Sequence, residues 1–267
     1  MTSEWSFSAR SAIVTGAGSG IGKAVTLALA AAGAKVLAVD IDGDAAKATA
    51  SEAMATEAMA TEAPSSVVPH QADVADRAAV FGYAAAATAE HGAPTLFFNN
   101  AGVEGVHKSI LDTDPADWLR VIDVNLNSMF WGLQAVLPHM VSEGFGAVVN
   151  TGSILSLKSA PGRSDYAVTK HAVLGLTRSA ASEMAAHGIR INCLCPGPIE
   201  TPLMRRSELL VNPNDPDWER RRFEEGTPIG RYASPREIAE TVMFLLRGDV
   251  AYQTGSAVVI DGGITSV

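Results

Sequence analysis

Two side chains that could carry proton chemistry, Tyr166 and Lys170, lie four residues apart in the segment YAVTK. The segment opens a helical run, and residues four apart on a helix lie on the same face. A phenol and an ammonium group would therefore be neighbours, which makes them a candidate catalytic pair. The pair alone is weak evidence, because roughly one in eleven chains of this composition would contain such a spacing by chance.

Two further polar residues occur where a site could form. Ser153 lies thirteen residues before Tyr166, at the end of the strand-like run GAVVNT. In an open α/β sheet, that end of a strand faces the ligand crevice. Asn125, in DVNLNS, lies inside a helical run although asparagine forms helices poorly. Asn125 is therefore either an irregularity of packing or a member of the site.

A glycine-rich loop joins the strand-like run SAIVT to an alanine-rich helical run. Gly16, Gly20 and Gly22 follow the spacing G-x-x-x-G-x-G. Glycines permit a tight turn and a close approach to a pyrophosphate, and the helix N-terminus offers free N–H groups. The nucleoside triphosphate alternative fails because Lys23 is followed by Ala24. A glycine cluster often marks only a turn, but the strand before it and the helix after it favour a dinucleotide-binding loop.

The choice of dinucleotide depends on Asp40, which ends the next strand-like run, KVLAVD. An acidic residue at this offset meets the hydroxyls of the adenosine ribose and would repel an extra ribose phosphate. Neither Ser19 in the loop nor Ile41 after Asp40 supplies a basic partner for such a phosphate. The sequence therefore predicts NAD over NADP; the alternative is that Asp40 only caps the following loop.

The elements that must position these residues alternate between apolar, β-branched runs and alanine-rich helical runs. The strand-like runs are Ser11–Thr15, Lys35–Val39, Ser66–His70, Thr95–Asn99, Gly146–Thr151, Arg190–Leu194 and Ala257–Ile260. The helical runs are Gly20–Ala32, Gly43–Glu62, Arg77–His91, Pro115–Ser142, Asp165–His187 and Pro235–Arg247. Continuously apolar strands indicate a sheet covered on both faces, and the alternation predicts right-handed βαβ crossovers.

No Pro- or Ser-rich linker divides the chain. We therefore expect residues 1–267 to form one α/β domain of the Rossmann type. Its sheet is expected to be doubly wound, mainly parallel and seven-stranded, with helices on both faces.

Composition bounds the class of protein. Hydrophobic residues make up 47% of the 267 residues and charged residues 18%, which suits a large core and excludes disorder as the main character. The net charge of −9 argues against nucleic acid or an anionic membrane surface as the main partner. No apolar stretch is long enough to span a bilayer, and MTSEWSFSAR lacks the features of a signal peptide. A soluble, cytoplasmic protein is expected.

The two cysteines, Cys193 and Cys195, lie in the strand-like run RINCLCPG. Their spacing places both on one face of a strand, too far apart for a well-formed disulfide. The six histidines form no group with the spacing of metal ligands. We expect two buried core residues, no structural disulfide and no metal.

Two segments interrupt the alternation. Residues 52–63 repeat every five residues, so that Met54 and Met59 do not share a helical face, and a solvated extension of one helix is expected.

The segment 201–230 is long, polar and rich in proline. Its arginines 220–222 have acidic neighbours, which favours a solvated mixed-charge helix. The segment is followed by a capping box at Ser234. We hypothesise that 201–230 is a lid, ordered by ligands, whose apolar face covers the substrate. The residues expected to form that face are Leu203, Met204, Leu209 and Leu210.

These motifs together resemble the short-chain dehydrogenase/reductase family over nearly the whole chain. The matching segments are TGAGSGIG at 15–22, the ADV around Asp73, NNAG at 99–102, Asn125, Ser153, YAVTK at 166–170, PGPIET at 196–201 and DGG at 261–263. One departure is NTGSI, where the family more often has a second serine beside the catalytic one. The offset to Tyr166 still selects Ser153 over Ser156.

The resemblance implies a role for each candidate. Tyr166 is the general acid/base, whose ordinary pKa of about 10 would be lowered by Lys170 and by the nicotinamide charge. Ser153 holds the substrate oxygen, Lys170 also binds the nicotinamide ribose, and Asn125 holds a water that links Lys170 to solvent. The implied cofactor contacts are Gly16, Ser19, Gly20, Ile21, Gly22, Asp40, Ile41, Asp73, Val74, Asn100, Ala101, Gly102, Tyr166, Lys170, Pro196, Gly197, Ile199 and Thr201.

The resemblance implies an NAD-dependent oxidoreductase that interconverts a secondary alcohol and a ketone. A looser similarity to bacterial reductases of cyclic ketones suggests a small, cyclic substrate. The predicted substrate contacts are Ser153, Tyr166, Glu104, Leu155, Arg163 and Leu203. The alternatives are a 3-oxoacyl thioester reductase and a non-catalytic scaffold or redox sensor that binds the dinucleotide. A homotetramer packed through 115–142 and 165–187 is also implied.

Overall fold

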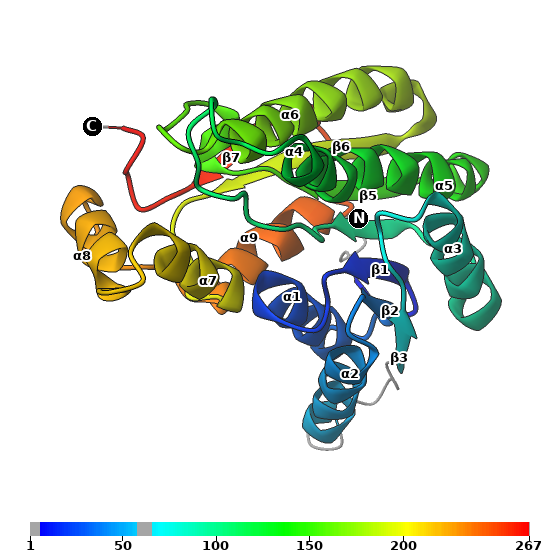
Figure 1. The fold of residues 1–267 in the computed structure, drawn as a ribbon. Helices are drawn as coiled ribbons and strands as arrows, with labels where there is room; N and C mark the ends of the chain where they lie inside the picture. The colour runs from blue at the N-terminus through cyan, green and yellow to red at the C-terminus, as the bar shows by residue number, and fades with distance from the viewer. Residues whose placement is uncertain (1–5, 58–65, 267) are drawn as a thin grey trace.

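A computed structural model describes residues 6–57 and 66–266 of the chain. Its central element is one sheet of seven strands, all parallel, in the order β3-β2-β1-β4-β5-β6-β7 (Figure 1). The strands are β1 (Ser11–Thr15), β2 (Lys35–Asp40), β3 (Ser66–Gln71), β4 (Leu96–Asn99), β5 (Gly146–Thr151), β6 (Ile189–Pro196) and β7 (Ala257–Ile260). The predicted doubly wound sheet with helices on both faces is confirmed.

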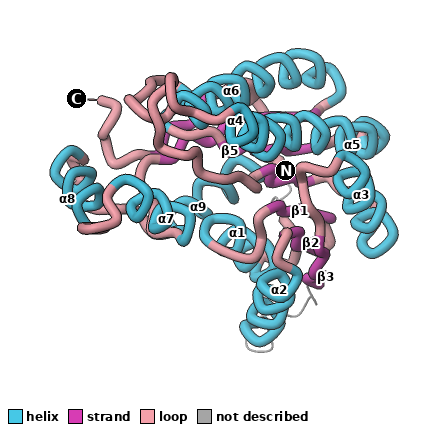
Figure 2. The backbone as a smooth tube through the Cα atoms, viewed as in Figure 1, coloured by secondary structure: helices cyan, strands magenta, loops and turns pink. Residues whose placement is uncertain are grey.

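Helices cover both faces of this sheet, so the structure has three layers (Figure 2). The helices are α1 (Gly20–Ala31), α2 (Gly43–Glu57), α3 (Arg77–His91), α4 (Pro115–Ile122), α5 (Ser128–Glu143), α6 (Ser164–Met184), α7 (Pro202–Val211), α8 (Asp217–Gly226) and α9 (Pro235–Leu246). Helices α1, α2 and α9 contribute to the core on one face, and α3, α5 and α6 to the core on the other.

The alternation of side chains along β1 explains why its sequence is continuously apolar. Val14 belongs to the core that α1 and α9 cover, whereas Ile13 belongs to the opposite core. In the sheet register Ile13 lies beside Leu37 of β2 and Phe97 of β4. All of these side chains are fully buried, so each strand needs apolar residues on both faces.

The run 115–142 is not one helix as the sequence suggested. A π-helical turn, Asp123–Asn127, separates α4 from α5, and Asn125 lies at its centre. Such turns insert one extra residue into a helix and often occur at functional sites.

Helix α2 is described as far as Glu57 and Met54 is exposed, in agreement with a solvated helix. The rest of the repeat, including Met59, lies outside the described residues.

The segment 201–230 folds into two helices, α7 and α8, and the predicted capping box of α9 is present. The prediction of one inward apolar face on α7 is wrong. Leu209 and Leu210 are 44% and 53% exposed, whereas the buried residues of α7 are Ser207 and Glu208. These polar side chains can be buried because each has a partner: Ser207 accepts from Arg163 of another segment, and Glu208 accepts from Arg205 on α7 itself.

The two cysteines lie on one face of β6 and are buried, as predicted. The Sγ atoms of Cys193 and Cys195 are 3.9 Å apart, and both thiols are free. Within the described ranges, no group of three or more His, Cys, Asp or Glu side chains is arranged to hold a metal ion. None of the described helices has both the length and the apolar character needed to cross a membrane.

Candidate active site

The carboxyl ends of the parallel strands bring the candidate residues to one edge of the sheet. The loop after β1 carries Gly16, the loop after β4 carries Asn100, and the loop after β5 carries Ser153. A ligand of an open α/β sheet binds at this edge. Partly buried hydrogen bonds hold the strand ends together. The Thr15 hydroxyl accepts from the Asn100 backbone N–H at 2.9 Å, and the Thr151 hydroxyl donates to the Asn100 side-chain oxygen at 3.1 Å.

Tyr166 and Lys170 lie on the first turns of α6, on the same side of the helix, as their spacing predicted. The Lys170 ammonium nitrogen is 5.4 Å from the centre of the Tyr166 ring. Lys170 is buried, and its ammonium group donates a hydrogen bond to the Thr151 carbonyl oxygen at 2.8 Å. The cation is thus fixed between α6 and the end of β5, beside the phenol.

Ser153 is positioned by a 3₁₀ turn, Ile154–Ser156, that it caps. Its Oγ accepts a hydrogen bond from the Leu155 N–H at 3.1 Å. The Ser156 hydroxyl accepts from the Ser153 N–H at 3.1 Å and donates to the Lys170 carbonyl oxygen at 2.8 Å. Ser156, which the sequence analysis set aside, therefore ties the Ser153 turn to α6. Its position three residues after a capping serine was the signal for this.

Electrostatics at the pair differ from the expectation. Burial raises the pKa of Tyr166, the Glu104 carboxylate raises it further, and hydrogen bonding to Ser153 opposes the rise. Burial also lowers the pKa of Lys170 to about 8. In the protein without cofactor, burial therefore raises the Tyr166 pKa more than the Lys170 cation was expected to lower it. The reason is that removing the phenolate from water disfavours the charged form more strongly than the attraction of the buried cation favours it.

Asn125 uses its amide on the backbone of the loop after β4. Its Oδ1 accepts from the Val103 N–H at 2.8 Å, and its Nδ2 donates to the Val103 carbonyl at 2.9 Å. The Nδ2 also lies 3.5 Å from the Thr169 hydroxyl on α6. The π-helical turn therefore aims Asn125 at the loop and at α6, and its direct partners are these groups and not Lys170.

The glycine loop has the shape of a phosphate cradle. Gly16 has a φ of +69°, and a Cβ on Gly22 would lie 2.0 Å from the Gly16 carbonyl oxygen. Both positions therefore require glycine. Ser19, the N-cap of α1, makes no side-chain capping bond, so the N–H groups of the first helical turn remain available to an anion. Ile21 lies in that first turn. These features fit a bound pyrophosphate.

Asp40 lies at the end of β2 and faces the glycine loop. Its Oδ2 accepts from the Gly18 N–H at 2.8 Å, and its Oδ1 accepts from the Asp42 N–H at 3.0 Å. Ile41 is 64% exposed, and Lys23 is held in an ion pair with Glu52. Asp40 thus caps its own loop and also presents a carboxylate beside the cradle, which combines the two interpretations of the sequence.

The remaining predicted cofactor residues also lie along this edge. Asp73 and Val74 follow β3, with Asp73 exposed and its Oδ1 accepting from the Ala75 N–H. The Ala101 N–H donates to the Thr15 hydroxyl at 3.0 Å, and a Cβ on Gly102 would lie 3.8 Å from the Lys170 ammonium nitrogen. The loop 99–102 therefore runs from the glycine cradle to the catalytic helix.

The segment after β6 closes the other side of the edge. The Gly197 N–H, next to Pro196, donates to the Ile260 carbonyl at 3.0 Å, and the buried Ile199 forms an isolated parallel bridge with Ala233. Thr201 caps α7 through its hydroxyl, and a Cβ on Gly20 would lie 3.1 Å from its methyl group. Thr201 therefore sits against the glycine loop.

Of the predicted substrate residues, Glu104 and Arg163 are directly bonded to each other, while Leu155 and Leu203 are half-buried. Arg163 also reaches residues that the sequence analysis missed, namely His107, Ser207 and Glu219. Glu219 was grouped with the solvated charges of α8, but it is buried. Sequence periodicity could not show this, because its partner lies 56 positions away.

The rest of that charged run is exposed at Arg221, Arg222 and Glu225, as predicted, whereas Arg220 and Glu224 are half-buried. The guanidinium of Arg220 pairs with Glu200 and with Glu224, and that of Arg221 pairs with Asp215. The side chains of these pairs are between 32% and 54% exposed, and ion pairs that solvent reaches contribute little to stability.

Comparison with known proteins identifies the fold and the family. A family model described as enoyl-(acyl carrier protein) reductase matches residues 16–265. A levodione reductase of Leifsonia aquatica is 39% identical over 96% of this chain and 94% of its own. A crystal structure of levodione reductase superposes with a TM-score of 0.93 at 38% identity, covering 98% of this chain and 99% of that one.

Two further relatives act on different alcohols, according to their names. A 2-keto-3-deoxy-L-fuconate dehydrogenase of Xanthomonas campestris pv. campestris is 39% identical over 94% of this chain and 78% of its own. A cyclohexanol dehydrogenase of an Acinetobacter species is 38% identical over 97% of this chain and 96% of its own. The match spans the glycine loop, α6 and the segment after β6, and on this basis the chain belongs to the short-chain dehydrogenase/reductase family, whose members are oxidoreductases that use NAD or NADP.

Proposed function

We propose that this protein is an NAD-dependent oxidoreductase that interconverts a secondary alcohol and a ketone. The observation that carries the proposal is the fixed arrangement of Ser153, Tyr166 and Lys170. The Ser156 hydroxyl bonds both the turn that bears Ser153 and the helix that bears the other two residues. A site held by such supporting bonds is preorganised for one reaction geometry.

Tyr166 is the proposed proton donor in ketone reduction and the acceptor in alcohol oxidation. Because burial raises its pKa, Tyr166 holds its proton near neutral pH and is ready to donate it. Ser153 accepts one bond from the backbone through its Oγ, and its own hydroxyl proton can point to the substrate oxygen. When bound, NAD would supply or accept the hydride; the protein orients the partners.

NAD is proposed as the cofactor because of Asp40. The carboxylate is held beside the glycine cradle by the Gly18 N–H, where a ribose hydroxyl could donate to it. A phosphate on that ribose would meet a negative charge, and the side chain that follows Asp40 is the apolar Ile41.

The substrate class that we favour is a small secondary alcohol or its ketone, cyclic in the simplest case. Levodione reductase and cyclohexanol dehydrogenase support a ring substrate. A 3-oxoacyl-(acyl-carrier-protein) reductase of Thermotoga maritima, 33% identical over 94% of this chain, keeps a 3-oxoacyl thioester reductase as the second candidate. A scaffold or redox sensor is disfavoured because Ser153, Tyr166 and Lys170 are all present and held by specific bonds.

Further proposals concern assembly and place in the cell. Exposed apolar side chains on α4, α5 and α6, among them Leu119, Phe130 and Val168, support packing of these helices in a homotetramer. We also propose one domain over residues 1–267 and a cytoplasmic location.

The segment 201–230 is proposed as a lid that polar contacts, and not an apolar face, fasten over the site. Stronger protection of this segment from hydrogen exchange with NAD and a substrate analogue would support the lid.

The experiment that tests the function is a turnover assay with NAD and with NADP over a panel of cyclic and linear secondary alcohols, with a 3-hydroxyacyl thioester included. NAD reduction by the alcohols supports the proposal. Turnover of the thioester alone would favour the second candidate, and binding of NAD without any turnover would favour the scaffold.

A further inference from the structure

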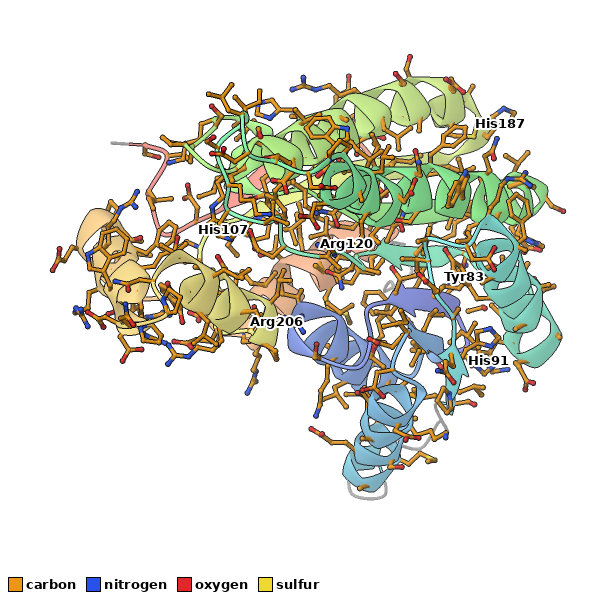
Figure 3. All side chains as sticks on the ribbon, in the orientation of Figure 1. Tyr83, His91, His107, Arg120, His187 and Arg206 are labelled. Carbon is orange, nitrogen blue, oxygen red and sulfur yellow. The ribbon has the colours of Figure 1, made fainter. Side chains whose placement is uncertain are left out.

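A buried ion cluster lies between the start of α6 and the α7–α8 pair. Its centre is Arg163, whose Nη1 donates to Glu104 and lies 2.9 Å from the His107 ring. Its Nη2 donates to Glu219 of α8 at 2.8 Å and to the Ser207 hydroxyl of α7 at 3.2 Å. His107, labelled in Figure 3, lies between these segments, 3.3 Å from the Ser207 hydroxyl. The side chains of Arg163, Glu104 and Glu219 are only 12%, 11% and 4% exposed.

This cluster borders the substrate end of the site. Arg163 lies three residues, about one helical turn, before Tyr166. The loop that bears Glu104 is fastened to the π-helical turn by Asn125 and to α6 by Asp165, which accepts from the Val106 N–H at 3.0 Å. Helix α7 is capped by Thr201, whose methyl group lies against Gly20, so this helix runs from the proposed pyrophosphate cradle to the cluster.

The charges in the cluster do not balance. One guanidinium faces two carboxylates, and the His107 ring, 3.3 Å from Glu104, adds a second cation only when it is protonated. The buried carboxylate of Asp165 lies next to Tyr166 and accepts from its N–H at 2.7 Å. The nearby cation on α6, Lys170, is directed to the Thr151 carbonyl oxygen on the other side. The substrate end therefore has an excess of negative charge. Arginine is the usual partner for a carboxylate or phosphate on a substrate, but here both of its terminal nitrogens are already bonded.

We propose that Glu104 and Glu219 act as specificity determinants that occupy Arg163 and restrict the enzyme to substrates without a negative charge near the reacting carbon. An anionic substrate would have to displace one of these carboxylates and leave it buried without its partner, which is strongly unfavourable. Selectivity then comes from a repulsive element built into the site. Because the relatives include both a cyclohexanol and a fuconate dehydrogenase, the cluster places this chain with the enzymes of uncharged alcohols.

The inference rests on the proposed function, and a matched substrate pair tests it separately. Oxidation of a hydroxycyclohexane carboxamide and of the corresponding carboxylate is followed with NAD at about pH 8, where histidine side chains are ordinarily neutral. We expect kcat/KM for the carboxamide to exceed that for the carboxylate by at least about tenfold. The ratio cancels effects that the two substrates share, such as the protonation of Tyr166.

Two variants change the charge of the cluster in steps while keeping a hydrogen-bond acceptor. Glu219→Gln makes the cluster neutral, and the double variant Glu104→Gln/Glu219→Gln makes it positive. The ratio of kcat/KM for the carboxamide to that for the carboxylate should fall by about tenfold in total across this series. The affinity for NAD should stay the same and serves as the check on folding. The control is Glu225→Gln, an exposed position on the same helix, which should leave the ratio unchanged.

The inference is overturned if the wild type oxidises the carboxylate as well as the carboxamide, or if Glu225→Gln changes the ratio as much as Glu219→Gln does. Either result leaves the proposed function standing, because the carboxamide is still oxidised with NAD. Failure of every uncharged alcohol in the panel would instead overturn the proposed function and this inference with it.

Discussion

The ammonium group of Lys170 donates a hydrogen bond to the carbonyl oxygen of Thr151, 2.8 Å away, at the last residue of β5. This bond joins the catalytic helix to the strand whose end leads into Ser153. It also gives the buried cation a partial negative charge to face, which a buried ammonium group needs. The relative positions of the serine and the tyrosine therefore depend on how α6 docks on β5.

Ser156 should be a positioning residue for this docking. Ser156→Ala removes one bond to the Ser153 N–H and another to the Lys170 carbonyl. Leaving such buried groups unpaired costs about 1–3 kcal/mol of unfolding free energy. We expect kcat to fall by about tenfold with KM for NAD unchanged, measured by steady-state kinetics and thermal unfolding. Ser182→Ala, an exposed position on α6, is the control, and equal kcat in the two variants would show that Ser156 does not position the site.

The pH dependence should respond to Glu104. Its carboxylate raises the pKa of Tyr166, and alcohol oxidation requires the tyrosine without its proton. Oxidation should therefore increase with pH, and Glu104→Gln should lower the Tyr166 pKa and move the rising limb to lower pH by about 0.5–1 unit. Profiles of kcat/KM against pH for the variant and for Glu225→Gln measure this. A shift of the limb to higher pH would contradict the electrostatic role of Glu104.

Cofactor preference should depend on Asp40. The wild type is expected to prefer NAD, and Asp40→Ala should narrow that preference by removing the repulsion of a ribose phosphate. Asp40→Asn is the sharper variant, because it removes the charge and keeps an acceptor for the Gly18 N–H. The ratio of kcat/KM for NAD to that for NADP should fall at least about tenfold, or 1.4 kcal/mol. Asp44→Asn on α2 is the control, and a wild type that prefers NADP would refute the interpretation of Asp40.

The strands could be predicted closely because each is a short, continuously apolar run between turn residues. β1, β5 and β7 have the predicted bounds, since burial of both faces leaves a strong local pattern. The spacing of Tyr166 and Lys170 likewise identified a shared helical side. The π-helical turn at Asn125 could not be predicted from the local sequence, because Asn125 is bonded there to Val103, which belongs to the loop after β4.

The buried charges could not be predicted for a related reason. Glu219 belongs to a run of mixed charges that looks solvated, and its burial depends on Arg163, far away in the sequence. The same is true of Ser207, which a polar pattern would place in solvent but which lies between Arg163 and His107. Local periodicity reports which face of an element is apolar, and pairs formed across elements leave no periodic trace.

The most direct test of the central claim is the oxidation of a secondary alcohol by Tyr166→Phe. This change keeps the ring and removes only the hydroxyl that is proposed to move the proton. We predict that kcat falls at least about a hundredfold, within the range for loss of a general acid or base, while NAD affinity measured by calorimetry stays close to that of the wild type. Near-normal turnover by Tyr166→Phe, with NAD bound normally, would remove Tyr166 from the reaction and contradict the proposed mechanism.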